Sequence, residues 1–367
     1  MYDHKRKILL FLLIITLLFS LFTVYIYSSG GLSVSAKSAL LYSPETDTVL
    51  YSKSPHKRMA MASTTKIMSA IIAIENGNLD STVLVDDAAV GVEGSSIYIE
   101  KGESFKMLDL IYAMMLQSAN DAASAIALHI SGSIEGFAEL MNQKCIELGL
   151  KNTNFTNPHG LDSKYHYTSA YDLGMITAYA LKNPIFKEIV STYKKEIESS
   201  SKTRLLVNHN KLLKLCEGSI GVKTGFTKKS GRSLVGACMR DDTMLISVTI
   251  NAPDDWNDHR QMFDYGFSML ERQSLASIGQ YSYRIPVLNS EDKFLNIRNT
   301  EELSVLTVKD GSTIKTQILL PKYLVAPIKS GDTVGYVVFL RKDKEIGRIE
   351  LISEKDVEEE KKAFPFL

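Results

Sequence analysis

Apolar and polar residues alternate along residues 38–53, on both sides of a turn-forming Pro-Glu-Thr-Asp at residues 44–47. This period of two predicts a β-hairpin. Three further runs have the same strand character, at residues 218–227, 232–240 and 243–251. Asp241-Asp242 joins the last two runs as a hairpin turn. We expect the N-terminal hairpin to join these later strands in one antiparallel sheet.

Between these strands, apolar residues recur at helical spacing. The clearest case is residues 63–77, which open on hydroxyl residues and end at Gly77, a suitable helix C-cap. The same periodicity predicts five more helices, at residues 105–115, 121–130, 134–148, 170–181 and 259–272. Strands at both ends of a helical middle indicate a mixed α/β (α+β) domain, in which helices flank an antiparallel sheet beside an α-helical region.

After about residue 276 the pattern changes to short alternating strands separated by Gly, Asp and Lys turns. We expect a small all-β domain over residues 276–354, behind a larger domain over residues 37–275. The 367 residues are enough for two such domains. The tail at residues 355–367 is charged and has no persuasive amphipathic anchor, because Pro365 interrupts its only apolar cluster.

The N-terminus has the features of a segment that enters a membrane. A basic Lys-Arg-Lys at residues 5–7 precedes an apolar run at residues 8–27. This run is near the length of a spanning helix, whereas Val34 and Ala36 suit a signal-peptide cleavage site. Residues 1–36 are therefore either a signal peptide cleaved after Ala36 or a retained anchor that associates with the membrane. In both cases the bulk of the protein works outside the cytoplasm.

Charge and cysteine content argue against several kinds of function. The 42 basic and 42 acidic residues balance to zero, and no basic cluster outside the N-terminus indicates nucleic-acid binding. Cys145, Cys216 and Cys238 are too few for a disulfide framework and lack the spacing of metal ligands. We interpret them as small buried hydrophobic residues, although one pair could bridge in an oxidising compartment. No metal and no cofactor is predicted.

A candidate nucleophile lies at the start of the helix predicted at residues 63–77. Ser63 stands three residues before Lys66, which places both side chains on one helix face. The same spacing occurs at Ser54/Lys57, Ser191/Lys194, Ser199/Lys202, Ser290/Lys293 and Ser312/Lys315. Taken alone, the pair is thus an ordinary helix cap followed by a surface lysine. Only Ser63 opens so long an apolar helix, where free N–H groups favour an oxyanion and burial lowers a lysine pKa.

Two further short motifs offer partners for this pair. Lys223-Thr224-Gly225 lies inside a predicted strand, whereas the Lys-Ser-Gly at residues 229–231 lies in a loop and that at residues 329–331 lies in the β-rich domain. A cation at Lys223 would help to lower the pKa of a nearby lysine, and Gly225 would let another backbone approach closely. Ser118-Ala119-Asn120 is the one Ser-x-Asn, in the break between two predicted helices, where a hydroxyl can carry a proton.

In the order Ser-x-x-Lys, Ser-x-Asn and Lys-Thr-Gly, these motifs resemble the set found in penicillin-binding proteins and class A β-lactamases. The chain is most similar to the low-molecular-mass penicillin-binding proteins, the serine-type D-alanyl-D-alanine carboxypeptidases. The resemblance covers about residues 38–270 and includes the segments NPHGLD, TSAYDLG, NHNKLL and DYGF. It extends to the β-rich domain, which often follows in this family.

The resemblance implies a reaction. Ser63 would be acylated by the penultimate D-alanine of a peptidoglycan stem peptide, and the terminal D-alanine would leave. Lys66 would act as the general base, and Ser118 would pass the proton to the leaving group. Water would then hydrolyse the acyl-enzyme. β-Lactam antibiotics mimic the D-Ala-D-Ala end of the substrate, so they should acylate Ser63 and leave slowly.

The resemblance also implies a set of substrate-binding residues, namely Asn120, Lys223, Thr224, Gly225 and Phe226. Asn120 would hold the acyl-side amide, and Lys223 with Thr224 would bind the terminal carboxylate. The backbone N–H groups of Ser63 and Phe226 would form the oxyanion hole.

The sequence departs from the family pattern at two places. Some relatives carry a histidine where this chain has Phe226, which affects the expected substrate preference and pH behaviour. Some relatives also place an arginine near the segment before DYGF. Arg260 is a positional candidate for that arginine and for a contact with the substrate carboxylate.

Two other functions stay open at this point. A β-lactamase of the related fold needs a deacylating base, typically a Glu on a loop well after the Ser-x-Asn motif. The nearest candidates, Glu135 and Glu139, fall on a predicted helix, and the loop at residues 152–162 contains no Glu. A wall-binding scaffold with a relict site is disfavoured, because all the named side chains are present. His159, in the turn Pro-His-Gly, is predicted to be structural.

Overall fold

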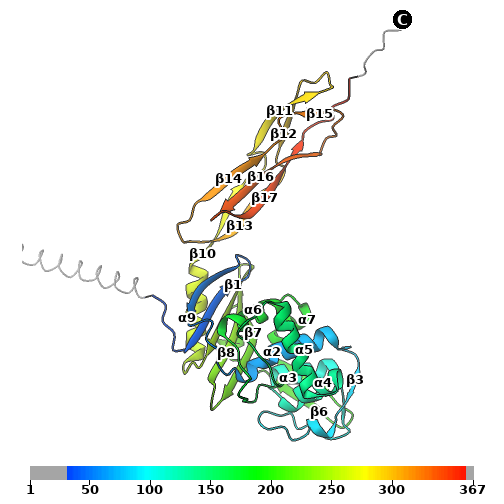
Figure 1. Cartoon of the computed structure of the whole chain (residues 1–367), viewed down its shortest axis with the longest axis vertical. Helices are drawn as coiled ribbons and strands as arrows, with labels where there is room; N and C mark the ends of the chain where they lie inside the picture. The colour runs from blue at the N-terminus through cyan, green and yellow to red at the C-terminus, as the bar shows by residue number, and fades with distance from the viewer. Residues whose placement is uncertain (1–30, 361–367) are drawn as a thin grey trace, which may run out of the picture. The chain divides into compact units, whose positions relative to one another are not determined.

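The computed structural model describes residues 31–360 of the chain (Figure 1). The apolar run at residues 8–27 and the cluster around Pro365 lie outside the described residues. Among the described residues, no helix combines the length and the apolar character needed to cross a membrane. Tertiary contacts divide the chain between Tyr265 and Gly266, with the short turn Glu45–Thr48 grouped with the second unit. We call the first unit, which contains the residues predicted to be catalytic, the catalytic unit, and the second the C-terminal unit.

A five-stranded sheet forms one part of the catalytic unit. Its strands are β1 (Ser38–Ser43), β2 (Thr48–Lys53), β7 (Ser219–Thr227), β8 (Gly231–Arg240) and β9 (Thr243–Ile250), in the order β2-β1-β9-β8-β7. The N-terminal strand β1 pairs antiparallel with β9, so the predicted joining of the two strand regions is confirmed. Asp241 and Asp242 both adopt positive φ, as a tight β8–β9 hairpin requires.

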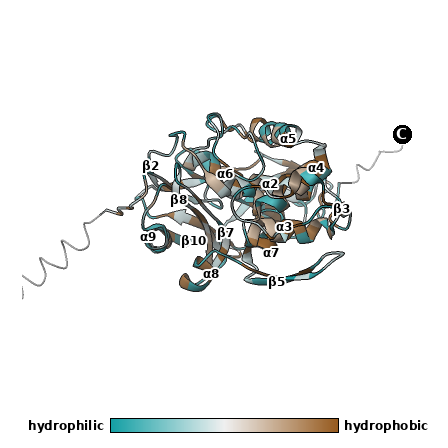
Figure 2. Cartoon of the chain, turned by 90° about the horizontal axis from the view of Figure 1, so that it is seen from below, coloured by the Kyte–Doolittle hydropathy of each residue, from teal (hydrophilic) through white to brown (hydrophobic). Residues whose placement is uncertain are grey.

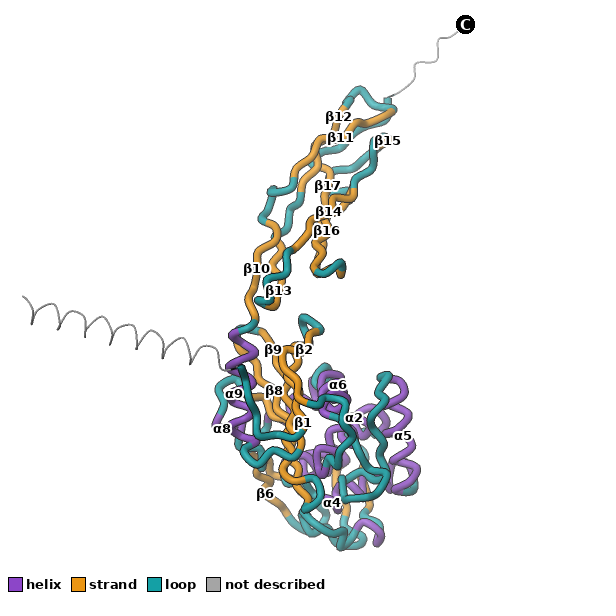
Figure 3. Tube along the Cα trace, turned by 60° about the vertical axis from the view of Figure 1, so that its left-hand side comes forward, coloured by secondary structure: helices purple, strands orange, loops and turns teal. Residues whose placement is uncertain are grey.

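The burial of β1 differs from the alternation expected from its sequence. All six residues of β1 are buried. The reason is that both faces of the sheet are covered: α6 (Ala170–Ala180) packs on β1 and β9, and α9 (Asp255–Ser268) covers the opposite face (Figure 3). The ring of His259 in α9 bonds to the hydroxyls of Ser247 and Thr249 in β9, and these point to the α9 face.

A group of helices packs beside the sheet. They are α2 (Lys66–Asn76), α3 (Met107–Leu116), α4 (Asn120–Ser131), α5 (Ile134–Glu147), α7 (Pro184–Ser191) and α8 (Leu212–Leu215). α2 lies at the centre and is buried from Lys66 to Ala73, and its neighbour α3 is strongly hydrophobic (Figure 2). A 3₁₀ turn, η1 (Ala62–Thr65), precedes α2, so the helix predicted at residues 63–77 is confirmed with a tighter first turn.

Short elements and one helix differ from the sequence prediction. The predicted helix at residues 259–272 starts earlier, as α9, and its last residues belong instead to β10 (Leu270–Ala276). β10 pairs with β13 (Leu303–Val308), and this distant pairing overrides the local helical pattern. The remaining short elements are η2 (Asp87–Ala89) and the strand pairs β3 (Thr82–Leu84) with β4 (Ser104–Lys106) and β5 (Lys194–Glu198) with β6 (Thr203–Val207).

The C-terminal unit is built from strands, as predicted. Its larger sheet has the order β14-β16-β17-β12-β11-β15. The bounds are β11 (Ser282–Leu288), β12 (Phe294–Arg298), β14 (Ile314–Leu319), β15 (Leu324–Val325), β16 (Thr333–Arg341) and β17 (Lys344–Ser353). Leu295, Ile297 and Phe339 are among the residues of its small separate core. The mixed α/β fold with a following all-β unit is thus confirmed.

Candidate active site

Ser63 lies on the tight turn η1, next to the buried start of α2. The hydroxyl of Thr64 donates to the carbonyl of Met61 over 2.6 Å, and that of Thr65 donates to the carbonyl of Ala62 over 2.7 Å. These bonds between side chain and backbone help to fix the turn, because each ties a side chain to a carbonyl three residues earlier. Ser63 itself is half-buried and faces a cavity.

Lys66 is fully buried and makes three polar contacts. Its Nζ lies 3.1 Å from Ser63 Oγ, 2.6 Å from Asn120 Oδ1 and 2.6 Å from the carbonyl oxygen of His159. Burial lowers the pKa of Lys66 well below its ordinary value, and the neighbouring Lys223 ammonium lowers it further. A lysine whose pKa is lowered in this way can act as a base.

The carbonyl of His159 reaches Lys66 because the NPHGLD loop packs directly on η1. Ser69 Oγ on α2 donates to the carbonyl of Pro158 over 2.5 Å. Gly160 adopts φ +93°, and a Cβ there would lie 2.0 Å from the carbonyl oxygen of Ala62. His159 therefore has the predicted structural place, but its main chain also contacts the buried amine.

Ser118 and Asn120 come from the junction of α3 and α4, as the break in the helical pattern predicts. Ser118 has φ +60°, which turns the chain sharply and leaves the residue 6% exposed at the cavity. Asn120 is the first residue of α4, and its Oδ1 accepts from Lys66. Its Nδ2 donates to the carbonyl of Glu93 over 2.5 Å. The amide oxygen of Asn120 thus orients Lys66, and its amide nitrogen holds a loop.

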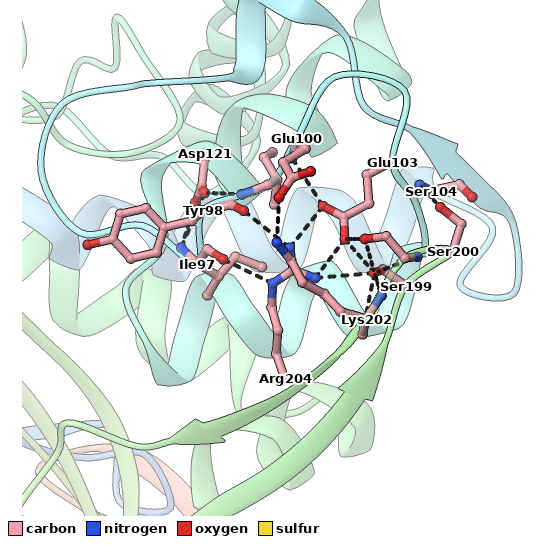
Figure 4. Close-up of polar contacts among 12 residues, drawn as sticks. Ile97, Tyr98, Glu100, Glu103, Ser104, Asp121, Ser199, Ser200, Lys202 and Arg204 are labelled. Carbon is pink, nitrogen blue, oxygen red and sulfur yellow. Dashed lines mark hydrogen bonds and ion pairs between the residues drawn. The ribbon is translucent and has the colours of Figure 1, made fainter.

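That loop, residues 91–103, is held by polar contacts at several points, and Figure 4 shows those made by Asp121 and Arg204. The carboxylate of Asp121 accepts from the backbone N–H groups of Ile97 and Ile99, at 3.2 Å each. At the far end, Glu103 forms a two-pronged ion pair with Arg204 of β6, with both N–O distances 2.8 Å. Burial alone would raise the pKa of Glu103, but the hydrogen bonds, that from Arg204 foremost, lower it to about 2.

Lys223 lies on β7, the edge strand of the sheet that faces η1. It is 1% exposed, and burial lowers the pKa of Lys223 to about 7. Two residues later, a Cβ on Gly225 would lie 3.1 Å from the backbone nitrogens of Ser63 and Thr64. The glycine therefore allows β7 to pack against η1, which brings the Lys-Thr-Gly motif beside the serine.

A cavity of about 390 Å³ opens above these residues. Its walls come from distant parts of the chain, namely Ser63, Ser95, Ser118, His209, Lys211, Thr224, Gly225, Phe226, Arg232, Ser233, Asp255 and Trp256. The structure therefore brings the eight predicted site residues together in two layers. Five of them line the cavity, and Lys66, Asn120 and Lys223 lie buried, with Lys66 hydrogen-bonded to Ser63 and Asn120.

The cavity also contains a cationic residue that the sequence analysis missed. Arg232 of β8 donates to Asp255 from Nε at 3.0 Å and from Nη2 at 2.7 Å, and its guanidinium lies over the ring of Trp256. Arg260, the positional candidate, is exposed on α9 and does not line the cavity. The signal available in the sequence was the position of Arg232 at the start of a strand adjacent to the Lys-Thr-Gly strand.

The candidates for a deacylating glutamate do not reach this cavity. Glu135 and Glu139 lie on α5, and neither lines the cavity. Asp255 is the one carboxylate among the lining residues described, and it is paired with Arg232. Within residues 31–360, no group of three His, Cys, Asp or Glu side chains is placed to hold a metal ion. The groups arranged around Ser63 are thus amines, hydroxyls and an amide.

Known proteins share both the sequence and the fold. The family described as D-alanyl-D-alanine carboxypeptidase matches residues 26–254, and the C-terminal domain family of penicillin-binding protein 5 matches residues 270–359. The D-alanyl-D-alanine carboxypeptidase DacF of Bacillus subtilis is 35% identical over 329 residues, which cover 87% of this chain and 84% of that protein.

Solved structures extend the similarity to three dimensions. Penicillin-binding protein 5 from Haemophilus influenzae superposes with a TM-score of 0.65 at 27% identity, over 89% of this chain and 98% of that one. The Streptomyces K15 DD-transpeptidase superposes with a TM-score of 0.62 at 29% identity, over 64% of this chain and 98% of that one. With the family match spanning more than half of its length, the chain belongs to the D-alanyl-D-alanine carboxypeptidase family.

Proposed function

We propose that this protein is a serine D,D-carboxypeptidase that removes the terminal D-alanine from peptidoglycan stem peptides. The observation that carries the proposal is the fully buried Lys66, 3.1 Å from Ser63 Oγ, with its pKa well below the ordinary value. β-Lactams would acylate the same serine, since they present a strained amide and a carboxylate in the arrangement of D-Ala-D-Ala.

The contacts of Lys66 can all be made by a neutral amine. A neutral amine has two N–H bonds and one lone pair, whereas an ammonium has three N–H bonds. The two short contacts, to Asn120 Oδ1 and the carbonyl of His159, use the two N–H bonds. In the neutral form, the lone pair would make the 3.1 Å contact with Ser63 Oγ, so that Lys66 would accept the serine proton during attack.

Attack on the penultimate D-alanine carbonyl forms an O–C bond and moves negative charge onto the carbonyl oxygen. The backbone N–H groups of Ser63 and Phe226 would receive this oxyanion. They lie on η1 and β7, which pack together at Gly225. The N-terminal end of α2 adds the favourable end of a helix dipole.

Collapse of this intermediate breaks the C–N bond to the terminal D-alanine. The leaving nitrogen needs a proton, and Ser118 would relay it from the protonated Lys66. Both serines line the one cavity. A water molecule then attacks the acyl-enzyme, with Lys66 again taking the proton, and the serine is restored.

Substrate binding would use the cationic wall of the cavity. Lys223 and Thr224 would bind the terminal carboxylate, and Arg232 adds a guanidinium donor on the wall of the same cavity as Thr224. Because burial holds the pKa of Lys223 at about 7, an incoming carboxylate would favour its charged form. Asn120 has a second N–H on Nδ2 beyond that given to Glu93, and this would hold the acyl-side carbonyl.

The test is mass spectrometry of a pentapeptide ending in D-Ala-D-Ala after incubation with the full-length protein. We expect loss of one alanine, and the loss should be abolished by Ser63→Ala. A fluorescent penicillin should label wild type stably at Ser63. Fast release of hydrolysed drug would indicate a β-lactamase instead, and a folded protein that neither labels nor cleaves would indicate a scaffold.

We also infer that the catalytic unit works outside the cytoplasm, where its polymer substrate lies. Val34 and Ala36 are buried, and Ser35 bonds to the carboxylate of Asp258 through its N–H and its hydroxyl. This packing favours a retained segment or a cleavage site before residue 34 over cleavage after Ala36. The N-terminal residue of the exported protein, read by mass spectrometry, distinguishes these cases.

A further inference from the structure

Two of the three cysteines lie side by side at the edge of the catalytic unit. Cys216 follows α8, and Cys238 lies on β8, with a distance of 4.0 Å between their sulfur atoms. Both are free thiols, and they stand 22 positions apart in the sequence. Neither belongs to the site described above, and neither lines its cavity.

The backbone around the two thiols is held closely, so their approach is not accidental. Met239 N donates to the carbonyl of Gly218 over 2.8 Å, and the Cys238 thiol donates to the carbonyl of Glu217 over 3.2 Å. Gly218 adopts φ +78°, and a Cβ there would lie 2.2 Å from the carbonyl oxygen of Met239. The glycine thus lets the chain after Cys216 pass directly over β8.

A disulfide needs the two sulfurs to approach to about 2.05 Å, so about 2 Å of closure is required. Rotation about the Cα–Cβ bonds of Cys216 and Cys238 moves each sulfur by this order of distance. The main chain on both sides is already paired through the β7–β8 ladder, where Ser219 stands opposite Cys238. The reaction therefore needs side-chain rotation rather than refolding.

The two sulfurs differ in access and in reactivity. Cys216 is 7% exposed, whereas Cys238 is fully buried. The neighbouring Cys238 thiol and the Arg240 guanidinium, whose Nη2 lies 3.9 Å from Cys216 Sγ, lower the pKa of the Cys216 thiol below its ordinary value. Burial raises the pKa of Cys145 on α5 to about 12. Cys216 is thus the thiol that an oxidant would reach first, and Cys238 is the buried thiol next to it.

We propose that Cys216 and Cys238 form an oxidisable dithiol that closes to an intramolecular disulfide with a small-molecule disulfide as oxidant. The Cys216 thiolate attacks one sulfur of the oxidant, which breaks the oxidant's S–S bond and releases its first thiol. Cys238 then attacks Cys216 Sγ and releases the second thiol. The oxidant takes up two electrons and the two thiol protons, and the protein gains one S–S bond.

The position of this bond connects it to the active site. α8 begins directly after Lys211, which lines the cavity, and β8 carries the lining residues Arg232 and Ser233. A covalent link from the end of α8 to β8 would therefore tie two walls of the cavity together. Occurrence of the bond in the cell rests on the proposed function, because that function places the unit in an extracytoplasmic, oxidising environment.

The test uses the full-length folded protein, incubated with oxidised or reduced glutathione and then trapped with N-ethylmaleimide. Digestion without reduction should give a linked Cys216–Cys238 peptide, with two hydrogens lost, and Cys145 alkylated only after unfolding. The melting temperature of the catalytic unit should rise by about 4 °C or more on oxidation, as a closed loop of this length implies.

Matched variants separate this bond from other thiol chemistry. Cys238→Ser should stop at a mixed disulfide of glutathione on Cys216, and Cys145→Ser should close as wild type does. The proposal is overturned if both thiols stay alkylatable after oxidation, or if the link forms only in urea. A stable mixed disulfide in wild type would equally contradict it. None of these readouts uses the peptidase reaction, whose failure is seen separately by penicillin labelling.

Discussion

The catalytic unit and the C-terminal unit carry the same short motifs, yet only one of them uses these motifs to build a cleft. The catalytic unit has Ser63/Lys66 and Lys223-Thr224-Gly225, and both of these lysines are buried. The C-terminal unit has Ser312/Lys315 and a Lys-Ser-Gly at residues 329–331. There, both lysines lie at the surface.

The surroundings of these surface lysines shift the lysine pKa in the opposite direction. Lys315 forms an ion pair of 2.9 Å with Asp343, and this bond raises the pKa of Lys315. Lys329 lies 3.4 Å from Asp356, and its pKa is likewise raised. In contrast, burial lowers the pKa of both Lys66 and Lys223. Spacing along the chain thus places two groups together, but burial and the charge of the neighbours decide whether an amine is a base.

The largest expected effect follows from removing the buried base. Lys66→Met keeps much of the side-chain volume but takes away the proposed proton acceptor of Ser63. We expect acylation by a fluorescent penicillin to slow by about 10³-fold or more, since a general base contributes about 10²–10⁴. The matched change Lys315→Met in the C-terminal unit should leave the rate within about twofold of wild type. Equal rates for the two variants would show that burial of Lys66 has no catalytic consequence.

The second comparison concerns the two Lys-[Ser/Thr]-Gly motifs. Lys223→Ala should raise KM for a D-Ala-D-Ala peptide and lower kcat/KM by about 10²-fold, because a buried charged contact to carboxylate contributes about 2–3 kcal/mol. Lys329→Ala changes only an exposed ion pair and should leave both constants unchanged. Steady-state release of D-alanine measures both. A Lys223→Ala enzyme with an unaltered KM would remove this residue from substrate binding.

A third effect concerns stability in acid, because all seven histidines lie before the C-terminal unit. The buried ring of His166 accepts from Thr156 N at Nδ1 and contacts Thr65 Oγ1 at Nε2. Burial lowers the pKa of His166 to about 4. In the unfolded chain the pKa of a histidine is about 6.5, so the unfolded state binds more protons than the folded state between about pH 6.5 and pH 4. The contribution of His166 to the free energy of unfolding is therefore complete above about pH 6.5 and is lost as pH falls towards 4.

At about pH 5 this linkage amounts to about 2 kcal/mol for His166. Trp256, the single tryptophan, lies in the catalytic unit, so its fluorescence reports denaturant unfolding of that unit alone. We expect the free energy of unfolding of wild type to fall between about pH 7 and 5. The free energy of unfolding of His166→Gln should fall by about 2 kcal/mol less over the same range. An identical pH dependence in the variant would mean that His166 is not held neutral.

The smallest effect should come from the cation at the cavity mouth. Arg232 is half-exposed and forms an ion pair with Asp255, so solvent and Asp255 both weaken its attraction for a substrate carboxylate. Arg232→Ala should lower kcat/KM by about tenfold, mainly through KM. Arg260→Ala, on the exposed face of α9, should have no effect. The opposite order would return the carboxylate contact to Arg260.

The sequence predicted the parts of the site that side chains alone define. Ser63, Ser118 and Lys223 stand in motifs whose spacing matches their elements, so their convergence was expected. The carbonyl of His159 was missed, because every residue has a carbonyl and only the packing at Gly160 aims this one at Lys66. Arg232 was missed because its place in the cavity depends on where α9 begins.

The fold shows the same division between local and distant causes. Hairpin β1–β2 and helix α2 follow from patterns within about 15 residues, and both were predicted. The segment after residue 268 has a helical pattern of its own, but β10 pairs with a strand about 30 residues further on. Such pairing is set by the whole sheet, and a window of sequence does not contain it.

The account depends on Lys66 being uncharged when Ser63 attacks, and the pH dependence of acylation tests this most directly. The rate constant at saturating penicillin, followed by covalent labelling of the full-length protein, should stay level from about pH 9 to pH 10.5, because the pKa of Lys66 lies well below its ordinary value. A rate that rises about tenfold per pH unit towards pH 10.4 would show an ordinary solvated lysine and contradict the account.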